Sequence, residues 1–167
     1  VTMPLGNPSN GFVSGGGCGG CEDPRATIID DRVYMTYVAY DGWNPPRVAL
    51  TSIALDDFLD HNFLWEKPVL ISQPGEVNKS AVIFPEKING KFAMLHRPKE
   101  WIGEEYGVSK PAVWIRFSDD MLVWNEPSTM LISGIDGGWE EKVGGSTPPL
   151  KTEKGWLVLY HGVENGG

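Results

Sequence analysis

Asp31-Arg32-Val33-Tyr34-Met35-Thr36-Tyr37 is a strand-like segment that indicates the fold, because similar segments return twice further along the chain. The two copies are Gly90-Lys91-Phe92-Ala93-Met94-Leu95-His96 and Lys154-Gly155-Trp156-Leu157-Val158-Leu159-Tyr160. The interval from Met35 to Met94 is 59 residues, and the same interval separates Trp65 from Trp124 and Pro68 from Pro127. A fixed period of this size, built only of strands, is typical of propeller blades.

The repeat therefore predicts an all-β fold. We expect one incomplete β-propeller domain over residues 1–167, with blades at about 21–73, 78–133 and 142–167, or about two and a half blades. The predicted strands are 26–29, 33–39, 48–54 and 65–71 in the first blade, 81–84, 91–96, 112–117 and 129–132 in the second, and 148–151 and 155–160 in the third. Asn89-Gly90 predicts a type I′ hairpin, and residues 56–62 allow one short helical turn at most.

The ends of the chain suggest a part of a longer protein. The chain begins at Val1 without a start Met, and it stops at Gly167 just after a third blade strand. A propeller needs at least about four blades to close its ring. We therefore expect an internal fragment, which would be poorly folded and inactive in isolation.

The composition argues against several classes of protein. The formal net charge of −8 disfavours nucleic-acid binding and binding to anionic membranes, because both require a basic face. No apolar run is long enough to span a membrane. The two cysteines provide no disulfide framework, so we expect reduced thiols and a cytoplasmic protein. Cys18 and Cys21 have zinc-like spacing but no further ligands nearby, and we expect neither a metal nor an organic cofactor.

Glu22-Asp23-Pro24-Arg25 places an acid pair and an arginine at the entrance of the first predicted strand, where the proline excludes helix. An Asp in this setting most often caps a turn. It can also act as the general acid in glycosidic cleavage, which needs a carboxylic acid beside the leaving oxygen. The motif by itself leaves both interpretations of Asp23 open.

Six motifs in a fixed order resemble glycoside hydrolase family 130, the mannoside phosphorylases and their hydrolase relatives. They are Glu22-Asp23-Pro24-Arg25, Phe84-Pro85-Glu86-Lys87-Ile88-Asn89-Gly90-Lys91, Leu95-His96-Arg97-Pro98, Phe117-Ser118-Asp119-Asp120, Pro148-Pro149-Leu150-Lys151-Thr152 and Tyr160-His161-Gly162. The resemblance implies a partial five-bladed β-propeller that covers roughly the middle half of a family member. It also implies that Asp23 is the sole catalytic acid, acting through the mannose 3-hydroxyl while inorganic phosphate attacks the opposite face of the sugar.

A phosphate nucleophile must be held in line by cations, because it loses its hydration on entering the site. The resemblance points to Lys79, Arg97, Lys142 and His161, which stand at corresponding places on different blades. Lys79 departs from the Arg that is usual in the family and offers a point charge instead of a bidentate fork. Hydrolysing members of the family tend to lose the Lys and His of this set, so their presence favours phosphorolysis.

Several other side chains have predicted roles. Trp43, Trp101 and Tyr106 lie in predicted loops and are candidates for stacking on sugar rings, with surface packing as the alternative. Trp65, Trp124 and Trp156 recur with the blades and are expected in the core between blades. The pairs Asp56-Asp57 and Asp119-Asp120 are expected to cap turns.

The predicted function is that of an inverting phosphorylase, which converts a β-mannoside and inorganic phosphate into α-mannose 1-phosphate. The alternatives are a β-mannosidase on the same scaffold and a non-catalytic carbohydrate-binding propeller. The expected partners are β-mannoside oligosaccharides and inorganic phosphate, without nucleic acid or membrane. Homo-oligomer formation is left open.

Overall fold

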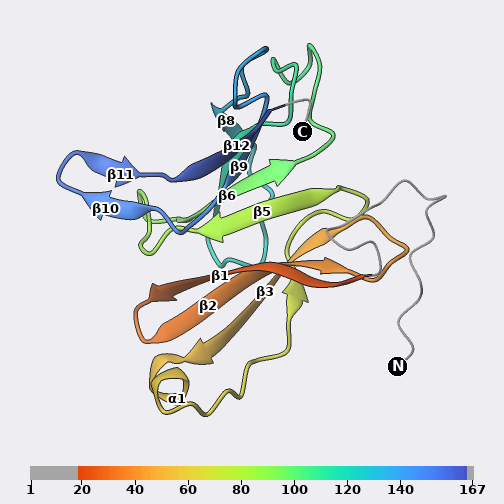
Figure 1. The fold of residues 1–167 in the computed structure, drawn as a ribbon. Coiled ribbons are helices and arrows are strands. Elements are labelled where there is room, and N and C mark those ends of the chain that lie inside the picture. Colours follow the sequence, from red (N-terminus) through yellow and green to blue (C-terminus); the bar gives the residue numbers. More distant parts are fainter. Residues whose placement is uncertain (1–18, 165–167) are drawn as a thin grey trace.

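The computed structural model describes residues 19–164, which form twelve strands and one short helix (Figure 1). The predicted all-β fold class is confirmed. Within residues 19–164, no helix is long and apolar enough to cross a membrane.

Two four-stranded antiparallel sheets follow one another along the chain, each with its strands in sequence order. The first sheet consists of β1 (Gly20–Ile29), β2 (Arg32–Tyr40), β3 (Arg47–Ala54) and β4 (Val69–Leu70), with helix α1 (Leu55–Leu59) between β3 and β4. The second consists of β5 (Asn78–Ile83), β6 (Phe92–Pro98), β7 (Val113–Ser118) and β8 (Thr129–Ile132). This repetition matches the 59-residue period seen in the sequence.

The remaining strands form two short antiparallel pairs beside the second sheet (Figure 1). One pair is β9 (Lys142–Gly145) with β12 (Tyr160–Val163), and the other is β10 (Leu150–Thr152) with β11 (Gly155–Leu157). The single strand predicted over 155–160 is thus divided, because β11 ends at Leu157 and β12 begins at Tyr160.

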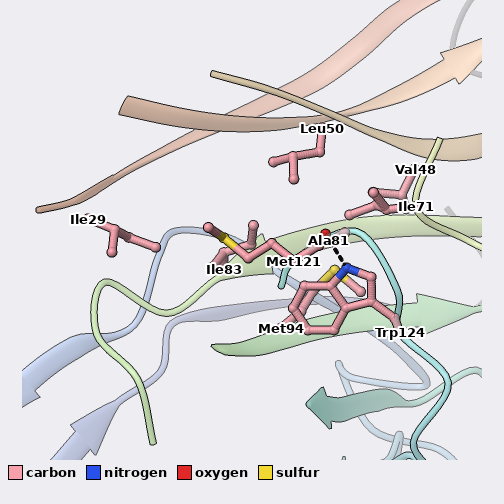
Figure 2. Close-up of a cluster of buried hydrophobic side chains, with 9 residues drawn as sticks. All are labelled: Ile29, Val48, Leu50, Ile71, Ala81, Ile83, Met94, Met121 and Trp124. Atoms are coloured by element: carbon pink, nitrogen blue, oxygen red, sulfur yellow. Dashed lines mark hydrogen bonds between the residues drawn. The ribbon is translucent and has the colours of Figure 1, made fainter. Parts of the chain in front are cut away.

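The second sheet is buried on both faces. Side chains alternate along β5, so Ala81 and Ile83 enter one core while Val82 and Phe84 enter another. The first core lies between the two sheets (Figure 2) and comprises Ile29, Val48, Leu50, Ile71, Ala81, Ile83, Met94, Met121 and Trp124. The second core joins the sheet to the third group of strands through Val143 of β9, with Trp156, Val158 and Tyr160 packed against it. Burying one such aliphatic or aromatic side chain stabilises the fold by about 1.5–3 kcal/mol.

The predicted hairpin at Asn89-Gly90 is confirmed. Both residues have positive φ, 52° and 83°, as a type I′ turn requires at its two central positions. The flanking residues Ile88 and Lys91 are bridged to each other. Glycine and asparagine therefore set the β5–β6 connection through local backbone preference alone.

The fourth strand of the first sheet is much shorter than predicted. β4 contains only Val69 and Leu70, although backbone amides of Glu66 and Ile71 still bond to β3 on either side of it. Pro68 lies directly before the strand, and its missing N–H cannot contribute to a ladder. The prediction of a strand over 65–71 was wrong at its beginning for this reason.

The repeated tryptophans do not share one environment. Trp124 is 1% exposed and belongs to the core between the sheets, as predicted. Trp156 packs against the second core and meets Phe84 edge-on. Within residues 19–164, Trp65 contacts Phe58 and lines a surface groove, so its predicted place in a core between blades stays a prediction.

Candidate active site

The motif Glu22-Asp23-Pro24-Arg25 lies within β1, at a bulge. The pairing of β1 with β2 shifts between Glu22 and Arg25, and Asp23 has a φ of 52°, in the left-handed region. A bulge tolerates a proline that has no N–H for the ladder, so β1 begins at Gly20 and not at residue 26 as predicted. The same distortion leaves Asp23 exposed at the end of the sheet.

Arg25 ties this motif to the far end of the chain. Its Nε donates to the Ser146 carbonyl at 2.7 Å and its Nη2 to the Gly145 carbonyl at 3.1 Å, while Nη1 donates to the Asp23 carbonyl at 2.8 Å. One guanidinium thereby fixes the bulge and holds it against the end of β9. The acid motif and β9 are about 120 residues apart in sequence.

Four cationic side chains from three strands and a loop meet around one pocket of about 210 Å³. They are Lys79 on β5, Arg97 on β6, Lys99 just after β6 and Lys142 on β9, with Pro46, Val77 and Pro111 as apolar walls. Lys79 and Arg97 are direct cross-strand partners. Arg97 Nη1 also donates to the Val143 carbonyl at 3.3 Å, which joins β6 to β9.

The charges in this pocket repel one another. The pKa of Lys142 is lowered, first by desolvation and then by the neighbouring charges of Arg97, Lys99 and Lys79. The pKa of Arg97 is lowered by desolvation and by Arg25, whereas the Asp23 carboxylate opposes that shift. Holding this many like charges together is unfavourable, and a bound anion would relieve the repulsion.

His161 joins the same group of charges. Its pKa is lowered, first by desolvation and then by Arg97, Arg25 and Lys142, and Asp23 raises it. The imidazole lies across its strand partner Gly144, where a Cβ would come within 2.5 Å of the ring, so only glycine leaves room for it. Nδ1 lies 3.5 Å from Ser146 Oγ. Arg97, Lys142 and His161 are thus within electrostatic range of one another, and Arg97 and His161 are also within range of Asp23.

Lys79 also meets a carboxylate. Its Nζ lies 3.7 Å from Glu22 Oε2, which links β5 to the acid motif on β1. Glu22 therefore contacts the cation cluster while Asp23 remains exposed beside it.

Lys99 was not among the predicted site residues. It follows Arg97 by two positions, and side chains two apart share one face of a strand. Applying that alternation beyond the end of the predicted strand would have identified it. Its backbone N–H donates to the Val77 carbonyl at 2.9 Å, which holds the segment after β6 against the pocket wall.

The aromatic candidates divide into packed and exposed rings. Trp101 and Tyr106 stack on each other with centroids 5.6 Å apart, and both meet Trp114 edge-on, so they form a small core in the segment between β6 and β7. Trp43 is 52% exposed. Trp139, which was not predicted, is 58% exposed and stacks on Tyr160, the neighbour of His161. Trp43 and Trp139 thus keep more than half of their surface in contact with solvent.

Within residues 19–164, no group of three or more His, Cys, Asp or Glu side chains is placed to hold a metal ion. Cys21 is exposed and not in a disulfide. Cys18, the other member of the predicted pair, lies outside the described residues.

Comparison with known proteins gives a consistent result. The family model of beta-1,4-mannooligosaccharide phosphorylases, glycoside hydrolase family 130, matches residues 15–166. The chain is 36% identical over 148 residues to a 1,2-beta-oligomannan phosphorylase of Thermoanaerobacter sp. (strain X514), covering 87% of this chain and 44% of that protein. It is 33% identical over 142 residues to a beta-1,4-mannooligosaccharide phosphorylase of Ruminococcus albus, covering 84% and 38%.

The fold is similar to a solved phosphorylase. The beta-1,2-mannobiose complex of beta-1,2-mannobiose phosphorylase from Listeria innocua superposes with a TM-score of 0.70 at 34% identity, over 87% of this chain and 37% of that chain. The chain thus spans less than half the length of the relatives that it matches.

Proposed function

The chain belongs to glycoside hydrolase family 130, and from that premise we propose that the full-length protein is an inverting phosphorylase of β-mannosides. It would cleave a β-mannoside with inorganic phosphate and release α-mannose 1-phosphate and a shortened acceptor. The described sheets would be successive blades of a five-bladed propeller, at about 21–73, 78–133 and 142–167. Inorganic phosphate would be the only co-substrate, and the reaction would need neither a metal nor an organic cofactor. The protein would act in the cytoplasm.

The observation that carries this proposal is the excess of positive charge in the pocket. Among residues 19–164, no carboxylate forms a salt bridge with Arg97, Lys99 or Lys142, although the sequence has 22 acidic residues and a net charge of −8. Arg97 is only partly exposed, and a charged side chain that is taken out of water is normally paired. A pocket of about 210 Å³ that gathers four cations, of which only Lys79 meets a carboxylate of the described residues, suits a small dianion such as phosphate.

Asp23 would serve as the general acid. Its proton would pass through the mannose 3-hydroxyl to the glycosidic oxygen as the bond to the anomeric carbon breaks. A phosphate oxygen would form the new bond from the opposite face, which converts the β-linkage into an α-phosphate. Arg25 supports this role because its contacts with Asp23, Gly145 and Ser146 hold the acid next to the cation pocket.

Lys79, Arg97, Lys142 and His161 would bind and orient the phosphate, and Lys99 would add charge at the edge of the pocket. Trp43 and Trp139 would contact the mannoside through their exposed rings. Trp101 and Tyr106 are better placed to support the pocket from behind, because their rings already pack on each other and on Trp114.

The test is phosphate dependence of turnover. The full-length protein is incubated with β-1,4- and β-1,2-mannobiose, with and without inorganic phosphate, and α-mannose 1-phosphate is measured. We expect its release only in the presence of phosphate, and Arg97→Ala should raise the phosphate concentration needed. Equal rates of mannose release in both conditions would establish a β-mannosidase instead. Sugar binding without any turnover would establish a binding propeller.

A further inference from the structure

A chain of buried polar side chains crosses the second sheet behind the cation pocket. Asn78 Nδ2 lies 3.0 Å from His96 Nδ1, His96 Nε2 lies 2.9 Å from Ser128 Oγ, and Arg116 Nε donates to the same hydroxyl at 2.7 Å. Asn78, His96 and Arg116 are 1%, 0% and 6% exposed. The chain takes one side chain each from β5, β6 and β7, and Ser128 directly precedes β8.

This polar chain lies on the reverse side of the Lys79–Arg97 pair. Asn78 precedes Lys79 and His96 precedes Arg97, and neighbouring side chains of a strand point to opposite faces. The cross-strand pairing of Lys79 with Arg97 is the last regular pair before a bulge, since the next pair is Val82 with Leu95. Two residues, Ser80 and Ala81, therefore stand opposite His96, and Ser80 has a φ of 56°.

A bulge interrupts the backbone ladder that would otherwise fix the distance and twist between the two strands. At this bulge the Asn78–His96 contact joins β5 to β6 through side chains, and Ser128 with Arg116 holds the other end of the imidazole. Arg116 is itself anchored, because its Nη1 donates to the Trp124 carbonyl at 3.2 Å. The contacts thus supply a rigid link where the backbone pairing is weakest.

We propose that Asn78, His96, Ser128 and Arg116 form a positioning network that sets the spacing of Lys79 and Arg97 for the phosphate nucleophile. This proposal rests on the proposed function. His96 is a positioning residue and not a phosphate ligand, because it is fully buried on the opposite face. The network would fix the two cations to the geometry of one phosphate ion.

The surroundings keep His96 uncharged. Desolvation and the Arg116 guanidinium lower its pKa from 6.5 to about 3, so the neutral ring bridges Asn78 and Ser128. Trp101 covers both groups, with its ring edge-on to His96 at 5.6 Å and the Arg116 guanidinium 5.2 Å from its centroid. Trp101 thereby closes the network from the side of the β6–β7 connection.

The test compares His96→Leu with a control in the full-length protein. Binding of inorganic phosphate is measured by calorimetry, and KM values are measured for phosphate and for mannobiose. A displaced ligand pair loses affinity, so we expect His96→Leu to weaken phosphate binding and raise its KM about tenfold, with less than about twofold change in the KM for mannobiose. Ser128→Ala removes one hydroxyl that does not line the pocket and should shift phosphate binding in the same direction with less effect on folding.

The matched control is Ser118→Ala, at the last residue of β7 and two positions after Arg116. Ser118 Oγ is buried and donates to the Val123 carbonyl at 2.6 Å, without contact to the network. We expect it to lower the thermal midpoint and to leave phosphate binding unchanged. If His96→Leu and Ser128→Ala lower the midpoint as Ser118→Ala does but bind phosphate normally, the network is only structural and the proposal is wrong. If the unsubstituted protein binds no phosphate, the proposed function itself is wrong, and this inference with it.

Discussion

The first and second sheets have the same plan, yet one is open where the other is enclosed. The second sheet packs between two cores, and Trp124 is almost completely buried. The first sheet packs on one face only within residues 19–164. Its other face, with Cys21, Met35, Tyr37 and Trp65, lines a surface groove of about 540 Å³. Side chains at the same position of the repeat thus contribute differently to stability in the two sheets, because their burial depends on the elements packed against each sheet and not on the repeat.

The two sheets also contribute different chemistry. The first strand of the first sheet, β1, carries the exposed acid Asp23 at a bulge, and the first strand of the second sheet, β5, carries the cation Lys79 just before another bulge. Bulges re-aim side chains near functional sites. The first strands of the two sheets therefore place a carboxylate and a cation near bulges at similar positions of the repeat.

The largest expected effect concerns the acid of the first sheet. Asp23→Asn keeps the size of the side chain and removes the proton donor, so we expect turnover of mannobiose by the full-length protein to fall about 100- to 10,000-fold. The thermal midpoint should change little, because Asp23 is exposed. Undiminished activity would remove Asp23 from the mechanism and leave the first sheet without a catalytic role.

The next test compares the two repeated tryptophans by denaturant unfolding. Trp124→Ala leaves a cavity between the sheets and should lower the free energy of unfolding by about 3–5 kcal/mol. Trp65→Ala removes a partly exposed ring from the groove and should cost no more than about 1–2 kcal/mol. Equal losses would mean that the open face of the first sheet is covered in the full-length protein.

Acid should destabilise the second sheet more than the first. His96 is neutral in the folded protein with a pKa of about 3, whereas the unfolded chain takes up a proton near pH 6.5. The unfolded state therefore binds more protons between these values, and stability is lost as pH falls below 6.5. From pH 7 to pH 5 the loss is about 2 kcal/mol. Urea unfolding of the unsubstituted protein and of His96→Gln at both pH values measures it, and an equal pH dependence in both would contradict the assignment.

The smallest effect is expected at the rim of the first sheet. Arg32 of β2 forms a salt bridge with Glu66, whose Oε2 also accepts from Ser52 Oγ at 3.0 Å. Both charged side chains are partly exposed, so a double-mutant cycle with Arg32→Gln and Glu66→Gln should give a coupling of less than about 1 kcal/mol that decreases with salt. A coupling above about 2 kcal/mol would show that this edge is more rigid than its exposure suggests.

Local sequence motifs predicted the turns correctly but overestimated the length of the edge strand β4. The Asn89-Gly90 hairpin follows from two residues that tolerate positive φ. Asp120 caps its turn as expected, with Oδ1 accepting from the Leu122 and Val123 amides at 2.8 Å, and these bonds lower its pKa. The strand around Pro68 was overestimated, because hydrophobic pattern alone does not register a missing donor in a ladder.

Residues that are neighbours in the chain, or that recur at a fixed interval, were sufficient to predict the repeat, the all-β class and the acid motif. Which of these residues meet depends on how the sheets pack together. Arg25 donates to carbonyls about 120 positions away in sequence, and Lys99 lines the cation pocket. Trp101, a candidate for stacking on a sugar, packs edge-on against His96. The alternation of side chains along a strand predicts the face of the sheet to which each side chain points. The distance between side chains on different sheets depends on how the cores between the sheets pack.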